Sequence, residues 1–245
     1  DDMAARRERT VAAVKERPIL FSGPMVRAIL EGRKTQTRRP ITHFDGSTYA
    51  LNPDYVRWQF QDGEDQRASY RNKWWAYPAG SGGSSFPVHG ERCRYGVEGD
   101  RLWVRETWRP TGIWDDMTTA KITKKFHDPR GAMKGHLVFR ADDRPYDSDC
   151  SGIWRPSIFM PRWACRLVLE VTRVRVERLQ EISESDAKAE GVTVYDQDVY
   201  PAATERGRFW GAIDAYHDLW DSLNAKRSPW ASNPWVWVVE FKVAQ

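Results

Sequence analysis

The sequence predicts a mixed α+β fold, mainly β, in which strands dominate and helices are few. Apolar and polar residues alternate over residues 99–108, 164–179 and 233–243, as they do in strands with one buried face. Two shorter apolar segments, 17–23 and 136–141, predict further strands. Helical apolar spacing and helix end signals occur at residues 23–32, 182–192 and 208–224. The chain shows no internal repeat.

The composition is that of a protein with a substantial core and no membrane-spanning helix. The chain has 245 residues, enough for one large domain or two small ones, and 40% of them are hydrophobic. It contains no run of 18 or more apolar residues. No apolar stretch follows the N-terminal arginines, as it would in a secretory signal. We therefore expect a cytoplasmic protein with no membrane partner.

Cysteine and histidine spacing gives no indication of a metal site. Cys93, Cys150 and Cys165 have no CxxC spacing and leave one cysteine over if two pair. None of the five histidines shares a metal-ligand spacing with another. We expect reduced, structural thiols, no metal and no cofactor.

The kind of positive charge is more informative than its amount. The formal net charge is only +4, but arginine outnumbers lysine 28 to 10. Arginine forks onto phosphates and stacks on flat rings, and the chain also has 13 tryptophans. This combination favours recognition of nucleic acid or of a nucleobase. The alternative is an ordinary protein whose arginine stems cover apolar surface.

The first half of the chain divides into an extension, a strand, a helix and an insertion. Residues 1–16 are charged and alanine-rich, and we expect a single domain to occupy 17–245. The helix predicted at 23–32 has Pro24 in its first turn and Gly32 as its terminator. Residues 43–97 mix aromatic and polar residues and then become rich in glycine and serine. We interpret them as an insertion with some order of its own that ends in a flexible linker.

The second half carries the long strands and two helices. In the helix predicted at 182–192, Ser183 is a candidate N-cap, Asp186 holds the acidic position of a capping box, and Gly191 ends the helix. The segment 208–224 has the apolar spacing of an amphipathic helix. Pro156 and Pro161 predict a rigid loop before the strand at 164–179.

The stretch EGRKTQTRRP, residues 31–40, contains the most distinctive chemistry. It lacks the glycine-rich lead-in of a P-loop, so it is not a P-loop. Its threonines are internal, so it contains no N-terminal nucleophile. A lysine among arginines loses its proton more readily, and Lys34 could then activate a nearby threonine for acyl chemistry if a carboxylate oriented the pair. The alternative is that Lys34, Thr35 and Thr37 end a helix and bind phosphate.

Four segments together resemble the ASCH domain, a member of the PUA-like superfamily. They are ILEGRKTQTRRP with its G-x-K-T-x-T-x-R pattern, GDRLWVRETW, ISESDAKAEGV and the terminal WVWVVEFK, and the likeness covers most of residues 17–243. The chain looks most like ASCH proteins encoded by phages and prophages. The resemblance implies a PUA-like β-barrel with flanking helices, with the signature at the mouth of a cleft. The insertion at 43–97 exceeds the minimal ASCH domain. For a phage protein, the expected location is the host cytoplasm.

The chain is also similar to small bacterial ASCH proteins that are N4-acetylcytidine amidohydrolases. Matched residue by residue, their lysine, threonine and glutamate fall on Lys34, Thr37 and Glu190. The resemblance implies that Thr37 attacks the acetyl carbonyl, Lys34 acts as the base, and Glu190 positions the lysine or shuttles a proton. The expected function is recognition of RNA or a modified nucleoside in a basic cleft, with amidohydrolase activity as a second layer.

Further residues are candidates for contacts with the substrate or with nucleic acid. Arg105 and Glu106 are adjacent on a predicted strand, so their side chains point to opposite faces and one of them should face the cleft. The full set of candidate binding residues is Arg33, Thr35, Arg38, Arg39, Arg105, Glu106, Arg155 and Arg162. Two other classes stay open: a nuclease of single-stranded RNA, and a non-catalytic phage-encoded adaptor whose aromatic insertion binds protein. The sequence does not indicate an oligomeric state.

Overall fold

The computed structural model describes residues 14–41, 56–61, 73–78, 89–110, 117–126, 137–142, 152–193 and 211–244. In these ranges strands outnumber the four α-helices, which confirms the mixed, mainly β class. The helices are α1 (Gly23–Leu30), α2 (Thr119–Phe126), α3 (Glu184–Ala189) and α5 (Ala212–Asn224). None of the helices in the described part of the chain is both long and apolar enough to cross a membrane. Most of the predicted extension, residues 1–13, lies outside the described ranges.

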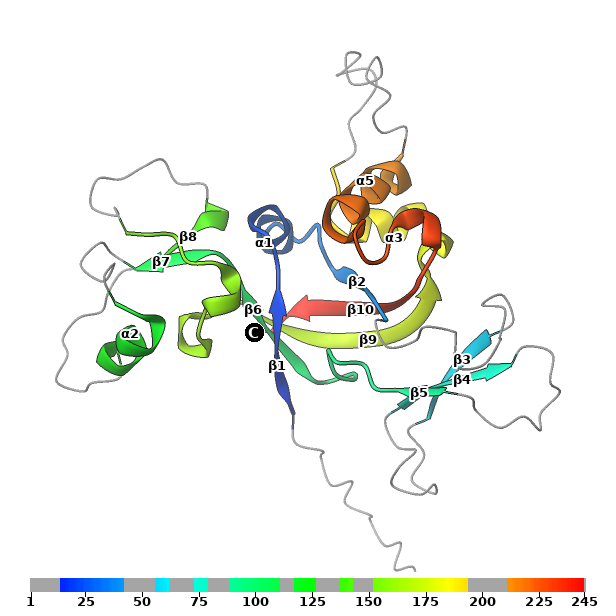
Figure 1. The fold of residues 1–245 in the computed structure, drawn as a ribbon, viewed down its shortest axis with the longest axis horizontal. Coiled ribbons are helices and arrows are strands. Elements are labelled where there is room, and N and C mark those ends of the chain that lie inside the picture. The colour runs from blue at the N-terminus through cyan, green and yellow to red at the C-terminus, as the bar shows by residue number, and fades with distance from the viewer. Residues whose placement is uncertain are drawn as a thin grey trace, which may run out of the picture.

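A five-stranded sheet forms the centre of the molecule (Figure 1). Its order is β1-β6-β9-β10-β2, with β1 (Glu16–Leu20), β6 (Arg101–Arg105), β9 (Val168–Arg178), β10 (Trp235–Val243) and β2 (Gln36–Pro40). Strand β1 runs parallel to β6, and the other neighbours pair antiparallel. The long strands predicted near 164–179 and 233–243 are therefore the two central partners, β9 and β10.

The predicted closed barrel is wrong for the described residues, because the sheet ends at β1 on one side and at β2 on the other. The two edge strands are linked by α1, whose Val26 and Ile29 pack in the core, and not by a hydrogen-bonded ladder. They approach at one corner, where the Arg39 guanidinium donates to the Leu20 carbonyl at 2.8 Å. The result is an open, curved sheet with a free edge along β2.

Strand β10 separates two apolar layers. Trp237 and Val239 belong to the main core cluster, which includes the buried side of α1. Val236 and Val238 alternate with them and pack on the opposite face against α3 and α5. Because β2 pairs with β10 in register, successive side chains of β2 also point to these two faces in turn.

Two smaller sheets flank the central one. Strands β3 (Val56–Gln61), β4 (Lys73–Pro78) and β5 (His89–Glu91) lie within the predicted insertion and form a three-stranded sheet. The Trp74 ring lies 6.1 Å from the Trp237 ring, and Cys93 and Tyr95 pack in or against the main core. The core therefore includes the end of the predicted insertion. Strands β7 (Trp108–Pro110) and β8 (Leu137–Phe139) make the third sheet.

Short 3-10 turns connect several of these elements. Near β8 and β9 they are η3 (Arg140–Asp142), η5 (Ser157–Phe159) and η6 (Arg162–Ala164), and later in the chain η7 (Leu179–Glu181) and η8 (Trp230–Ser232). Turns η5 and η6 occupy the segment that Pro156 and Pro161 predicted to be a rigid loop. Helix α2 was not predicted, because its polar sequence TAKITKKF offers few apolar positions from which to read a helical period.

Candidate active site

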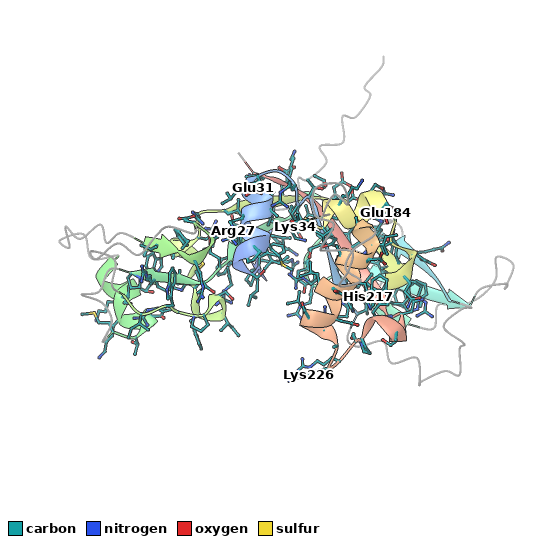
Figure 2. The ribbon with its side chains drawn as sticks, turned by 90° about the horizontal axis from the view of Figure 1, so that it is seen from above. Arg27, Glu31, Lys34, Glu184, His217 and Lys226 are labelled. Carbon is teal, nitrogen blue, oxygen red and sulfur yellow. The ribbon has the colours of Figure 1, made fainter. Side chains whose placement is uncertain are left out.

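Lys34 is placed where the chain turns from α1 into the edge strand β2. Helix α1 ends at Leu30, and Gly32 takes a left-handed conformation with φ of 74°. The backbone N–H of Lys34 donates to Ala28 O at 3.0 Å, and Lys34 then forms an isolated bridge with Glu190. Residues 36–40 are therefore strand, not helix end. Figure 2 shows Lys34 between α1 and the pair of helices α3 and α5.

The Lys34 amine and the Glu190 carboxylate form a buried ion pair. Lys34 Nζ donates to Glu190 Oε2 and to the Glu190 carbonyl, each at 2.8 Å. The two side chains are 0% and 3% exposed. Burial lowers the pKa of Lys34 below its ordinary value, and the attraction of Glu190 offsets this only in part, while the charges of Arg39 and Arg38 add to the lowering. The arrangement favours an amine that gives up its proton more easily than a surface lysine.

Glu190 owes its place to helix α3. The predicted N-cap is confirmed, because Ser183 Oγ accepts from the Asp186 N–H at 3.1 Å. Glu190 is the C-cap residue, and Gly191 follows with φ of 83°. The helix is short, so its C-terminal end brings the glutamate back to the edge of β2. The Glu190 side chain is buried and ion-paired instead of exposed at a helix end.

Thr37 lies in β2 on the face of the main core. It pairs with Val239, and Arg39 pairs with Trp237, so both side chains point to the face of these core residues. Lys34 Nζ and the Arg39 guanidinium carbon also approach that face, at 5.6 and 5.4 Å from the centre of the Phe21 ring. The amine and the Thr37 side chain therefore lie toward the same face of the sheet.

The Thr37 side chain is buried, and its hydroxyl is unpaired within the described ranges. Thr37 is 3% exposed, and its hydroxyl makes no hydrogen bond with any described residue. The hydrogen bonds of the Lys34 amine both go to Glu190. The structure thus joins Lys34 to Glu190 directly, and no hydrogen bond joins Thr37 to Lys34 in the described part of the chain.

Arg38 points to the opposite face and is held by acids. Its Nη2 donates to Glu177 Oε2 at 3.1 Å and to Asp186 Oδ2 at 3.0 Å. Arg175 donates to the same Asp186 oxygen at 3.0 Å. Burial acts to raise the pKa of Asp186, but the charges of Arg38 and Arg175 hold it below its ordinary value. The Asp186 carboxylate thus serves this ion-pair network and not the predicted capping box.

Arg33 and Thr35 lie at the rim of this site. Both residues are exposed. The Arg33 guanidinium donates to Glu31 Oε2 at 2.8 Å and to the Gly191 carbonyl at 3.1 Å. Thr35 uses its backbone, donating to Ala189 O at 2.9 Å. These contacts tie the end of α1 to the end of α3 beside the Lys34–Glu190 pair.

The remaining predicted binding residues make their contacts elsewhere. Glu106 is buried and accepts two hydrogen bonds from Arg166, at 2.9 and 3.0 Å. Arg105 donates to the Ile158 carbonyl. The Arg162 guanidinium donates two hydrogen bonds to the Glu16 carboxylate, at 2.9 and 3.2 Å. Arg155 donates to Met117 O at 3.0 Å. Among the residues that the structure describes, none of these side chains contacts Lys34, Thr37 or Glu190.

Tyr216 of α5 is a site residue that the sequence did not reveal. Its helical spacing predicts a core position, and it is indeed 3% exposed with its ring against Trp220 and Trp230. Burial, and after it the charge of Glu190, raise the pKa of the Tyr216 phenol well above its ordinary value. The phenol therefore lies within electrostatic reach of the Lys34–Glu190 pair. The apolar spacing of a helix does not indicate which buried side chain lies near an ion pair, so the sequence did not point to Tyr216.

Within the described ranges, no group of three or more His, Cys, Asp or Glu side chains is arranged to hold a metal ion. Cys93 and Cys165 are free thiols, and burial raises the pKa of Cys93 to about 12. Cys150 lies outside the described residues.

No protein-family model and no curated protein matches the sequence, and no solved structure matches the fold. The resemblance to the ASCH domain thus depends on the four sequence segments named above. The function is argued below from the contacts of Lys34, Thr37 and Glu190.

Gly191 provides a test of how tightly the site is packed. A Cβ at Gly191 would lie 2.8 Å from the Lys34 Cβ and 3.0 Å from the Ala28 Cβ, whereas one at Gly32 meets nothing within 4 Å. Both glycines are left-handed, so Gly32→Ala should cost about 1–2 kcal/mol of unfolding free energy. Gly191→Ala adds a clash and should cost about 2–4 kcal/mol. Chemical denaturation of the two variants measures the difference. Equal losses would show that the Lys34 stem does not pack on Gly191.

Proposed function

We propose that the protein hydrolyses the acyl amide of an N4-acylated cytidine at a site formed by Lys34, Thr37 and Glu190. The observation that carries the proposal is the fully buried amine of Lys34, bonded to both the carboxylate and the carbonyl of Glu190. Lysine is almost never fully buried unless it is paired, and buried lysines with lowered pKa values serve as general bases. The ASCH resemblance, in which these three positions carry the amidohydrolase chemistry, supports the same assignment.

Each of the three residues has one role in the proposed reaction. The neutral Lys34 amine takes the proton of the Thr37 hydroxyl as the threonine oxygen attacks the acyl carbonyl carbon. The bond between the carbonyl carbon and N4 then breaks, the leaving nitrogen takes the proton back from Lys34, and the acyl group remains on Thr37 as an ester. Water then attacks the ester carbon as Lys34 accepts a proton from it. The bond between that carbon and the Thr37 oxygen breaks, the threonine oxygen takes the proton from Lys34, and a carboxylic acid leaves. Glu190 orients the amine throughout.

The contacts of the arginines favour a nucleoside substrate over an RNA strand. Arg38 is bonded to Glu177 and Asp186, and Arg162 is bonded to Glu16. Arginines that already neutralise carboxylates have little charge left for phosphates. We therefore expect weak binding to single-stranded RNA, with a shallow dependence on salt, since a steep one requires several phosphate contacts. Electrophoretic shifts across a salt series measure this.

The direct experiment is a turnover assay on a panel of modified nucleosides. Purified protein is incubated with N4-acetylcytidine and with other acylated nucleosides, and the products are separated and weighed by mass spectrometry. We expect cytidine and acetate in equal amounts from N4-acetylcytidine. If the folded protein releases no cytidine at any pH from neutrality up to the ordinary lysine value of 10.5, the proposal is wrong.

The pH dependence of the rate reports the protonation of Lys34. Because only the neutral amine accepts a proton, kcat/KM should rise with pH as Lys34 deprotonates. Burial lowers the pKa of Lys34, so the midpoint of the rise should lie below the ordinary lysine value of 10.5. Glu190→Gln removes the charge that raises the pKa of Lys34, and the remaining activity of this variant should rise at lower pH. A rate that does not change with pH over this range would exclude Lys34 as the base.

A further inference from the structure

Several polar atoms around Glu190 are buried without a hydrogen-bond partner. They are Glu190 Oε1, Arg38 Nε and Nη1, and Arg39 Nε. Glu190 Oε1 and Arg38 Nη1 lie 3.5 Å apart, but neither forms a hydrogen bond. The Tyr216 hydroxyl also bonds to none of the described residues, although its side chain is almost fully buried. Buried polar groups are normally paired, so a cluster of unpaired ones indicates a place that a polar ligand fills.

The free edge of β2 runs through this cluster. The odd-numbered residues of β2 and its neighbours form hydrogen bonds with β10. Thr35 O, just before β2, accepts from Phe241 N at 2.8 Å. By the antiparallel pattern, the N–H and C=O groups of Gln36 and Arg38 point away from β10. In the described part of the chain these edge groups have no partner. Both residues are nevertheless only 2–3% exposed, so this edge is buried and is not an open surface.

Tyr216 lies on the same face of the sheet as Arg38. It packs in one buried cluster with Ala187 of α3 and with Val238, the residue that pairs with Arg38. The charges of Glu190, Arg38 and Arg39 all act on the pKa of its phenol, as this packing leads one to expect. Its ring is fixed by Trp220 and Trp230, with ring centres 6.2 Å away in each case. The hydroxyl is thus a rigidly held donor that the protein itself does not use.

We infer that the Tyr216 hydroxyl and Glu190 Oε1, together with the free edge of β2, bind the hydrogen-bonding edge of the substrate's base. An acylated cytosine has an amide N–H beside a ring nitrogen and a ring carbonyl, which is one donor next to two acceptors. Glu190 Oε1 accepts from the N–H, and Tyr216 and the edge N–H groups donate to the acceptors. The identity of the base rests on the proposed function, whereas the pairing of Tyr216 with a polar ligand does not depend on hydrolysis.

Tyr216→Phe tests the inference because it removes only the hydroxyl and keeps the ring. Affinity for cytidine, the product, is measured by titration calorimetry, so that turnover does not interfere. Loss of one ligand hydrogen bond should weaken cytidine binding about tenfold and raise KM for N4-acetylcytidine by a similar factor, with kcat little changed. Tyr95→Phe is the matched control, since it removes a phenol hydroxyl from a tyrosine packed elsewhere on the core, and it should bind cytidine normally.

The outcomes separate this inference from the proposed function. Weaker binding of cytidine by Tyr216→Phe supports the inference. It does so even if the unaltered protein hydrolyses no substrate, a result that would contradict the proposed reaction alone. Hydrolysis with unchanged cytidine affinity and KM in Tyr216→Phe overturns the inference and leaves the reaction standing. Failure of the unaltered protein to bind any nucleoside overturns both. A melting temperature of Tyr216→Phe close to that of the unaltered protein confirms that the comparison concerns the ligand and not the fold.

Discussion

Replacement of Thr37 by valine is expected to lower kcat for N4-acetylcytidine by at least about a thousandfold, because it removes the nucleophile. Valine has the shape of threonine, and Thr37 makes no hydrogen bond with the described residues that the fold would lose. The change removes a buried hydroxyl without breaking a hydrogen bond among the described residues, so the free energy of unfolding should fall by no more than about 1 kcal/mol. Steady-state kinetics and chemical denaturation on the same preparation check both parts.

Thr172→Val is the matched control for this experiment. Thr172 is likewise a threonine within a strand, β9, although it is half-buried where Thr37 is buried, and its hydroxyl takes no part in the proposed reaction. The control should keep full activity. Retention of more than about a tenth of the activity in Thr37→Val, far above what loss of a nucleophile permits, would show that another group attacks the carbonyl.

Replacement of Lys34 by methionine should give the largest loss of stability. Methionine fills the space of the lysine stem, but it leaves the Glu190 carboxylate buried without its main partner. Breaking a buried pair in this way costs about 3–5 kcal/mol, and we expect the lower part of this range because Arg38 stays 3.5 Å from the carboxylate. Denaturation by urea measures the loss, and the activity of this variant should also disappear.

A second change distinguishes an unpaired charge from poor packing. Lys34→Met combined with Glu190→Gln leaves no buried charge at the pair, so the double variant should be more stable than Lys34→Met alone. Lys242→Met is the control, since Lys242 and Glu170 form an exposed pair at 3.1 Å, and its cost should be about 0–1 kcal/mol. If Lys34→Met is no more costly than Lys242→Met, the Lys34 amine is solvated and the buried pair does not exist in solution.

The sequence predicted the elements better than their assembly. Strands β6, β9 and β10 and helices α1, α3 and α5 fall in the predicted segments, because alternation, helical spacing, Ser183 and the two end glycines are local signals. Closure of the sheet is not local. It depends on whether β1 and β2 pair. In the described residues they do not, and the Arg39 guanidinium instead donates to the Leu20 carbonyl.

For the candidate site too, the sequence indicated individual residues better than their contacts. Lys34 and Glu190 are 156 positions apart, and only the resemblance to a family linked them before the structure brought them to 2.8 Å. The sequence did not indicate that Arg38 would bond to Glu177 and Asp186, because charge composition does not reveal which cation faces which acid. Tyr216 was missed for a related reason. Its helical spacing is that of any core residue, and only the fold brings its phenol within electrostatic reach of Glu190.

The most direct test of the central claim is to look for the acyl group on Thr37. The protein is mixed with excess N4-acetylcytidine and quenched in acid at successive times. It is then digested, and the masses of its peptides are measured by mass spectrometry. The proposed reaction predicts an acetyl group on Thr37 in the quenched protein, and no acetylated peptide in Thr37→Val or Lys34→Met. Release of cytidine by protein whose Thr37 peptide carries no acetyl group at any time would contradict the account.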